Sequence, residues 1–249
     1  MTRPAQVLKK IINDLQKLKE NSQEALVIFD LDSTLFDVRQ RLENVLMNFA
    51  KEPENQKLFP EQVQYFKNIQ ILKHDWGIKD ILVRAGLDGH HREFQTAVRD
   101  YWVKHFFSNE ALVHDVPYAG AVQFVQAIAQ TNAEIIYLTG RDIERMGEGS
   151  RKILQLWGFP LDEIKHKLVL KPHRSMDDAL FKRDWFLNIA ANKYQKILFF
   201  ENEPLNIQHI RTTRPEVEII FFDSTHSRAA EAPIDLPTIL HFLTDDQES

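Results

Sequence analysis

Cysteine is absent from this chain of 249 residues, and basic residues are too few to outnumber the acidic ones. Without cysteine there are no disulfide bonds, thiolate metal sites or cysteine nucleophiles. Lysine and arginine together number 31 against 36 aspartates and glutamates, which leaves a net charge of -5 with histidine neutral. A chain without a basic surplus lacks the usual electrostatic footprint for nucleic acid. We therefore predict no nucleic-acid partner.

Long hydrophobic runs are also missing. No stretch approaches the roughly 20 apolar residues of a transmembrane helix. The N-terminal segment places Leu8, Ile11 and Leu15 at helical spacing, and it has neither the unbroken apolar run nor the small-residue cleavage site of a signal peptide. It is predicted to be a helix packed on the core. We expect a cytoplasmic protein with no membrane partner.

Five short apolar runs, rich in Ile, Val, Leu and Phe, predict the strands of a parallel sheet that is buried on both faces. Helical patterns lie between them, for example over 120–131 and 178–191, and Ser175 ahead of the second resembles the start of a capping box. Alternating strands and helices predict an α/β fold with a doubly wound parallel sheet. The five runs are 25–30, 134–139, 167–170, 196–201 and 217–222.

The connection between the first two runs is too long for a single crossover helix. Its sequence contains helical stripes, such as the one that includes Leu42 and Phe49. We predict that residues 38–116 form an inserted helical domain, which is within the size range of a small domain. The catalytic core would then consist of residues 1–37 and 117–249.

Carboxylates stand where predicted strands end. In open α/β sheets the ligand binds beyond the carboxyl ends of the strands, and here Asp30 and Asp32 follow the first run while Glu201 ends the fourth. Such carboxylates would repel one another without a cation, and an all-oxygen cluster suits Mg2+. A metal-bound Asp30 could attack phosphorus, and Asp32 could donate a proton to the leaving group and later take one from water. The plainer alternative is that both aspartates only cap a turn.

The pattern Asp-x-Asp-x-Thr at 30–34 resembles the first motif of the haloacid-dehalogenase-like superfamily. Thr139, followed by Gly140 and Arg141, resembles its second motif in the form typical of the acid-phosphatase-like branch. The resemblance implies a Rossmann-like core with a helical cap at the insertion. It also implies Mg2+-dependent phosphatase chemistry through a phospho-aspartate.

The residues of the second motif are the predicted phosphate ligands. A hydroxyl group and backbone N–H groups at a strand-to-helix turn bind phosphate well, which suits Thr139 and Gly140. Arg141 could add a bidentate contact to the phosphate. The alternative for Arg141 is an ion pair with Asp142 or Glu144, and the sequence favours neither reading.

The third motif of the superfamily is a lysine, for which the chain offers Lys171 and Lys182. Lys182 lies 201 − 182 = 19 residues before Glu201 and begins the helix that leads into that strand. This spacing resembles the acid-phosphatase-like pattern, so Lys182 is the predicted catalytic and phosphate-binding lysine. For either lysine the plainer alternative is an exposed surface charge.

The fourth motif, which holds the metal in the superfamily, departs from the usual pattern. Glu201 stands in place of the first Asp and Asn206 in place of the second. Glu keeps the charge but reaches further, Asn keeps an oxygen but loses the charge, and Mg2+ demands near-ideal octahedral geometry. The predicted metal ligands are Asp30, the main-chain carbonyl of Asp32, and Glu201.

Together these residues predict a Mg2+-dependent phosphomonoester hydrolase that acts on a small phosphorylated substrate. Its catalytic residues would be Asp30, Asp32, Thr139 and Lys182. The altered fourth motif motivates an alternative, a catalytically weak relative that binds a phosphorylated ligand or partner. The sequence indicates neither the identity of the substrate nor the oligomeric state.

Overall fold

A six-stranded parallel sheet forms the centre of the computed structural model, which describes residues 3–88, 91–190 and 192–244. The order across the sheet is β5 (His166–Lys171), β4 (Glu134–Asp142), β1 (Ala25–Phe29), β6 (Lys196–Glu201), β7 (Glu218–Phe222) and β8 (Thr238–Ile239). Each of the five predicted runs carries a strand. The predicted α/β fold with a doubly wound parallel sheet is therefore confirmed.

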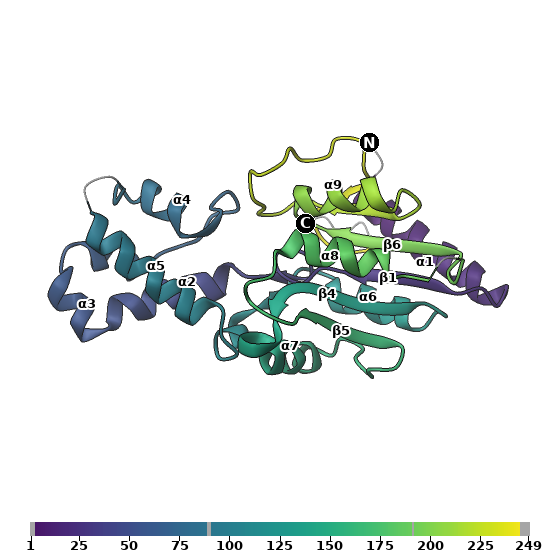
Figure 1. Cartoon of the computed structure of the whole chain (residues 1–249), viewed down its shortest axis with the longest axis horizontal. Coiled ribbons are helices and arrows are strands. Elements are labelled where there is room, and N and C mark those ends of the chain that lie inside the picture. Colours follow the sequence, from purple (N-terminus) through teal and green to yellow (C-terminus); the bar gives the residue numbers. More distant parts are fainter. Residues whose placement is uncertain (1–2, 89–90, 191, 245–249) are drawn as a thin grey trace.

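Helices cover both faces of the sheet (Figure 1). Val27 and Phe29 of β1 belong to the hydrophobic cluster on one face, and Leu26 and Ile28 belong to the cluster on the other. Because alternate residues of a strand point to opposite faces, an uninterrupted apolar run fills both layers. The first face carries α1 (Pro4–Glu20), α6 (Ala121–Ala129) and α7 (Ile143–Trp157), and the second carries α8 (Asp178–Leu187) and α9 (Pro204–Thr213).

None of the helices within the described ranges combines the length and the apolar character that a bilayer crossing requires. Two of them begin at an aspartate cap. Asp142 accepts a hydrogen bond from the backbone N–H of Arg145 at the start of α7, and Asp177 accepts one from Leu180 at the start of α8. A side-chain oxygen at this position satisfies an otherwise unpaired N–H of the first turn. The expectation that Ser175 begins the capping box of α8 was wrong, because the N-cap is Asp177, two residues later.

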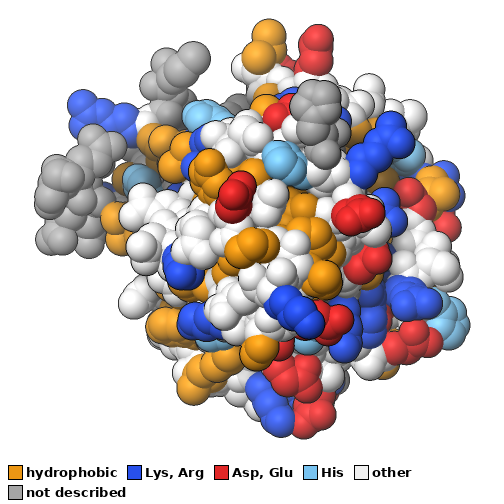
Figure 2. All heavy atoms as spheres, turned by 90° about the vertical axis from the view of Figure 1, so that its left-hand side faces the viewer, with side chains coloured by type: hydrophobic (Ala, Val, Ile, Leu, Met, Phe, Trp, Pro, Cys, Tyr) orange, Lys and Arg blue, Asp and Glu red, His pale blue; other side chains and the backbone are white. Residues whose placement is uncertain are grey.

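The long connection after β1 is helical and lies beyond one end of the sheet (Figure 1). It includes α2 (Arg39–Lys51), α3 (Pro53–Leu58), a 3-10 turn (Gln62–Phe66), α4 (Gly77–Arg84) and α5 (Arg92–Phe106), followed by a 3-10 turn (Ala111–His114). We call residues 39–106 the helical insertion. Its own core contains the rings of Phe49, Phe66 and Phe94, whose centroids lie 5.7 to 6.2 Å apart. On the surface at this end, hydrophobic side chains cross the middle and many charged ones lie towards the lower edge (Figure 2).

The insertion contacts the core at several places. The segments that enter and leave it pair as an antiparallel ribbon of β2 (Phe36–Asp37) and β3 (Val116–Pro117). Elsewhere, the Lys73 carbonyl accepts a hydrogen bond from Thr225 Oγ1 at 2.7 Å, and Lys73 Nζ pairs with Asp223 at 3.2 Å. The insertion is therefore joined to the core by the β2–β3 ribbon and also by the contacts of Lys73 with Thr225 and Asp223.

Candidate active site

The carboxyl ends of three adjacent strands meet at a cavity of about 1200 Å3. Asp30 directly follows β1, while Thr139 in β4 and Glu201 at the end of β6 flank it. The cavity continues between the core and the helical insertion. The structure brings all of the predicted site residues to its lining: Asp30, Asp32, Thr139, Gly140, Arg141, Lys182 and Glu201.

A tight turn after β1 presents both aspartates to the cavity. The Leu31 carbonyl accepts hydrogen bonds from the backbone N–H groups of Thr34, Leu35 and Phe36. Ser33 has a φ of 61°, a left-handed conformation that is uncommon for a residue other than glycine. The turn is therefore fixed by several hydrogen bonds at the cost of local backbone strain.

Asp30 and Glu201 share a single buried ammonium group. Lys182 Nζ donates to Asp30 Oδ1 at 2.6 Å and to Glu201 Oε2 at 2.7 Å. All three side chains are almost completely excluded from solvent. When both carboxylates are ionised, this group carries a net charge of -1.

The surroundings of Asp30 favour its protonated form. Burial raises the pKa of Asp30 to about 7, an effect that Lys182 opposes and Glu201 adds to. Burial alone would lower the pKa of Lys182, but the two carboxylates raise it above its ordinary value. Lys182 is therefore a permanent cation beside Asp30, whichever form Asp30 takes.

Glu201 accepts as many hydrogen bonds as a carboxylate usually can. Its Oε1 atom accepts from the backbone N–H groups of Asn202 and Glu203, both at 2.9 Å. Its Oε2 atom accepts from Lys182 and from Asn206 Nδ2 at 3.0 Å. A carboxylate has about four acceptor positions, so all of them are occupied in this arrangement.

Asp32 lies in the opposite electrostatic environment. Its Oδ1 atom accepts from Arg41 and from Arg141, each at 2.6 Å. Both guanidinium groups also bind Asp115, which is completely buried, at 2.6 to 2.7 Å. These four charges balance. Burial would raise the pKa of Asp32, but Arg141 and Arg41 hold it far below its usual range.

Arg141 pairs with neither of the partners that the sequence suggested. Its guanidinium group binds Asp32 and Asp115, whereas Asp142 accepts hydrogen bonds from Arg145. Its backbone N–H donates to Thr139 Oγ1 at 3.2 Å, and Thr139 is almost fully buried. A phosphate contact from Arg141 would thus compete with two existing ion pairs.

The two candidate lysines lie in different places. Lys182 contacts Asp30, whereas Lys171 Nζ donates to the Met176 carbonyl at 2.9 Å and to Asp178 at 2.5 Å. Both lysines line the cavity. Of the two, only Lys182 contacts Asp30, the predicted nucleophile.

Arg41 and Asp115 are parts of this site that the sequence reasoning did not single out. Arg41 is completely buried although it carries a charge. A signal for it exists, because Arg41 lies four residues before Val45 and therefore on the same apolar stripe of α2. A charged residue on a buried stripe usually has a buried partner.

The oxygen donors of the site bear on whether it suits Mg2+. Within the residues that the structure describes, no group of three or more His, Cys, Asp or Glu side chains is arranged around a metal position. Asp30 nevertheless suits a hard cation, because Oδ2 accepts no hydrogen bond from the described residues and the group it shares with Lys182 and Glu201 is negatively charged. Glu201 could join as a ligand only by giving up one of its hydrogen bonds.

A sequence model of the haloacid dehalogenase-like hydrolases matches residues 25–176. This range includes the turn after β1 and the end of β4, and it stops before Lys182 and Glu201. A comparison with curated protein sequences gave no match.

Solved structures with a similar fold include proteins of three bacteria. A protein of Burkholderia xenovorans assigned as a haloacid dehalogenase-like hydrolase has a TM-score of 0.51 at 12% identity, over 88% of this chain and 94% of that one. A protein of Clostridium difficile assigned as a phosphatase has a TM-score of 0.51 at 12% identity, over 80% and 84%. The protein tyrosine kinase A of Mycobacterium tuberculosis has a TM-score of 0.51 at 13% identity, over 86% and 92%. At such identities the similarity shows a shared fold.

Proposed function

The chain belongs to the haloacid dehalogenase-like hydrolases, which are generally phosphatases that use Mg2+, and we propose that it hydrolyses phosphate monoesters with Asp30 as the nucleophile. The observation that supports this most directly is the position of Asp30. It lines the cavity at the end of β1, and the buried ammonium group of Lys182 lies 2.6 Å from it. A fixed cation at this point can stabilise the negative charge of a transferring phosphoryl group.

In the first step an Asp30 oxygen forms a bond to phosphorus. The bond between phosphorus and the ester oxygen breaks, its electron pair stays on the leaving oxygen, and Asp32 supplies the proton. Lys182, the Thr139 hydroxyl and the Gly140 backbone N–H surround the phosphoryl group. In the second step Asp32 takes a proton from water, the water oxygen bonds to phosphorus, and the bond to Asp30 breaks.

The arginines beside Asp32 limit its action as an acid. Two guanidinium groups stabilise its ionised form, so little of Asp32 is protonated and able to supply a proton to the leaving group. Esters with weakly basic leaving groups, such as phenols, should therefore react faster than alkyl esters. The helical insertion, which supplies part of the cavity wall, would act as the cap that excludes water.

Mg2+ would be held by Asp30 and by the main-chain carbonyl of Asp32. When bound, it supplies positive charge between the Asp30 carboxylate and the phosphate dianion. With Asp30 ionised, Asp30, Lys182 and Glu201 together carry a net negative charge that opposes the binding of an anionic substrate, and the cation would offset it.

The test compares Asp30→Asn with Asp178→Asn, since Asp178 also lines the cavity but contacts Lys171 instead of Lys182. Phosphate release from 4-nitrophenyl phosphate is measured with Mg2+ present. We expect wild-type turnover for Asp178→Asn and a loss of about 1000-fold or more for Asp30→Asn. Acid-quenched wild-type protein should carry phosphate on the peptide that contains Asp30. Wild-type turnover in Asp30→Asn would show the mechanism to be wrong.

A second candidate function is the binding of a phosphorylated ligand without efficient turnover. The observation that favours it is the saturated hydrogen bonding of Glu201, together with an amide at Asn206 where relatives carry a carboxylate. Under this alternative, phosphate esters and Mg2+ raise the thermal midpoint of unfolding, but no phosphate is released from a broad panel of esters. Turnover of any ester at an enzymatic rate decides in favour of hydrolysis.

A further inference from the structure

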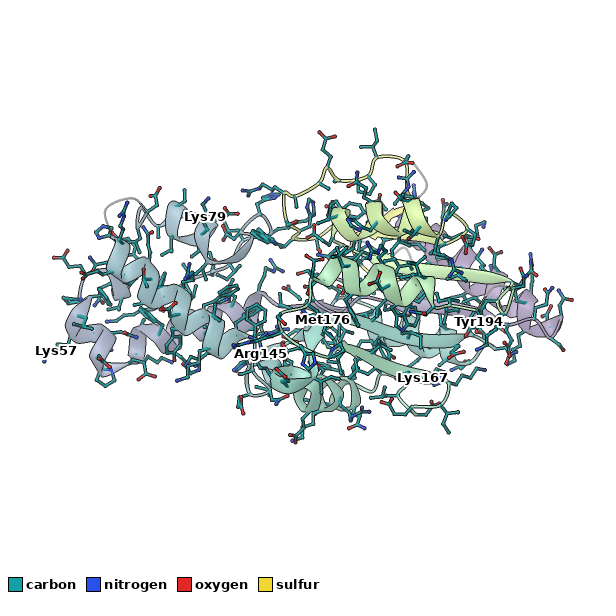
Figure 3. All side chains as sticks on the ribbon, viewed as in Figure 1. Lys57, Lys79, Arg145, Lys167, Met176 and Tyr194 are labelled. Carbon is teal, nitrogen blue, oxygen red and sulfur yellow. The ribbon has the colours of Figure 1, made fainter. Side chains whose placement is uncertain are left out.

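The two ends of the cavity differ in chemical character. The core supplies the charged end around Asp30. The helical insertion supplies the other end, where the lining is largely apolar and includes Leu42, Ile71, Trp76, Ile78, Leu82 and Val83. Both parts of the chain contribute to the lining, which includes Lys79 of the insertion and Met176 of the core, both labelled in Figure 3.

Two polar side chains at the apolar end, Asp75 and Gln95, already have partners. Asp75 accepts hydrogen bonds from the Leu72 backbone N–H at 2.9 Å and from Arg84 at 2.6 Å. Gln95 donates to the Leu87 carbonyl at 3.0 Å. Asp75 and Gln95 are therefore engaged by the protein itself, and the charged side chains of Lys79, Asp88 and Arg99 also line this end.

Two large hydrophobic side chains of the insertion are exposed within this lining. Trp76 is 52% exposed and Val83 is 50% exposed, and both border the cavity. Deeper in the cavity, the rings of Trp102, Phe106 and Phe107 lie within 5.0 to 5.6 Å of one another. Exposed apolar surface that is contiguous with a polar reaction site is characteristic of ligand pockets.

We propose that the substrate is a phosphate monoester of a large, mainly apolar alcohol or phenol, whose organic group lies against the helical insertion. This inference rests on the proposed function for the position of the phosphate. The cavity of about 1200 Å3 is much larger than a phosphate group needs, and its apolar lining makes no demand for hydroxyl groups on the ligand. The apolar group would cover Trp76 and Val83 and remove them from water.

The experiment uses a series of 4-alkylphenyl phosphates from methyl to pentyl, in which the leaving group keeps nearly the same basicity. Each methylene that becomes buried should raise kcat/KM by about fourfold until the chain fills the cavity. The rise should come from KM with kcat nearly constant, because the alkyl group binds equally in the ground state and the transition state. Glucose 6-phosphate and glycerol phosphate, as polar esters, should be poor substrates.

Matched variants distinguish the cavity from the rest of the surface. Val83→Ser and Trp76→Ser should flatten the dependence on chain length, while Val103→Ser and Tyr65→Ser should leave it intact. Val103 and Tyr65 are also exposed residues of the insertion, at 41% and 55%, and they do not line the cavity. 4-Methylphenyl phosphate should be hydrolysed by Val103→Ser and Tyr65→Ser at the wild-type rate.

Binding of the corresponding 4-alkylphenyl phosphonates, measured by calorimetry, separates this inference from the proposed function. If affinity rises with chain length but no phosphate ester is hydrolysed, the ligand class is supported and the proposed function fails. If esters are hydrolysed with no dependence on chain length in either kcat/KM or phosphonate affinity, the ligand class is overturned and the proposed function stands.

Discussion

Two aspartates of the same turn, Asp30 and Asp32, lie in opposite electrostatic surroundings. Asp30 shares one ammonium group with Glu201, so its group has a net charge of -1 when both carboxylates are ionised. Asp32 shares two guanidinium groups with Asp115, so its group is neutral. The pKa of Asp30 is raised to about 7 by burial, whereas the arginines hold the pKa of Asp32 far below its usual range.

This difference shows that charge balance, rather than position in the sequence, sets the chemistry of each carboxylate. A group with an unbalanced negative charge attracts a cation, and it is the natural place for a metal and a nucleophile. A balanced group of alternating charges resists disturbance and fixes geometry.

The largest effect is expected from Lys182→Met, which removes the only cation of the Asp30 group. Turnover should fall by about 1000-fold, because the buried carboxylates repel each other and the phosphoryl group loses its fixed positive charge. Steady-state rates of 4-nitrophenyl phosphate hydrolysis measure the loss. Lys171→Met is the matched control, since Lys171 lines the same cavity but bonds Asp178, and it should stay within about threefold of wild type. Equal losses in both variants would contradict the assignment of Lys182.

Asp115→Asn tests the neutral group, because it leaves two buried arginines with a single carboxylate. The free energy of unfolding should fall by about 3 kcal/mol, as expected when one partner of a buried ion pair is removed. Urea unfolding provides the measurement. Asp37→Asn is the control, since Asp37 pairs with the partly exposed Arg39 and should contribute about 1 kcal/mol or less. A loss as small for Asp115 as for Asp37 would mean that the charges are not balanced as described.

Stability as a function of pH should separate the two aspartates. The pKa of Asp30 is higher in the folded chain than its ordinary value of 3.8, so its contribution to stability is complete below that value and is lost as pH rises through about 7. Asp32 has a lowered pKa, so its contribution is constant over the same range and is lost only in acid. In metal-free buffer, the free energy of unfolding of the wild type should therefore fall between about pH 5 and about pH 8. That of Asp30→Asn should fall by about 2 kcal/mol less over the same range.

Denaturant unfolding at several pH values measures this slope, with Asp178→Asn as a control that should behave like wild type. An identical slope in wild type and Asp30→Asn would assign the titration to another group.

The smallest effect is expected from Asn206→Asp, which sharpens the comparison by adding a further negative charge to the Asp30 group. Asn206 Nδ2 now donates to Glu201 at 3.0 Å, and a carboxylate there would repel Glu201 instead. The metal-free protein should become less stable, while the affinity for Mg2+ should rise by about tenfold. Calorimetric titration with Mg2+ measures the affinity. Asn188→Asp, on the exposed end of α8, should change neither property.

The fold was predictable because the central strands are buried on both faces, which requires continuous apolar runs such as 196–201 and 217–222. Strands of only two residues are too short to show any periodicity, so β2, β3 and β8 could not be found in this way. The capping residue of α8 was misplaced for a related reason. Several side chains in that segment can cap a helix, and the sequence alone does not say where the helix begins.

The site was predictable where it follows from the sheet. Asp30, Thr139 and Glu201 end adjacent parallel strands, and that topology places them together. The ion pair of Arg41 with Asp115 joins residues 74 positions apart, and it forms only when the helical insertion packs on the core. Contacts of that kind depend on tertiary packing, and short-range patterns in the sequence do not predict them.

Arg41 belongs to the first turn of the helical insertion, yet its guanidinium group binds two carboxylates of the core. The orientation of the insertion and the proton affinity of Asp32 are therefore thermodynamically linked. A rotation of α2 that withdrew Arg41 would leave Asp32 with Arg141 alone and make its protonation easier. By reciprocity, protonation of Asp32 would weaken the binding of Arg41, and with it the attachment of the insertion to the core, by the same free energy. Movement of the insertion away from the core and protonation of Asp32 would then be coupled, so that each favours the other.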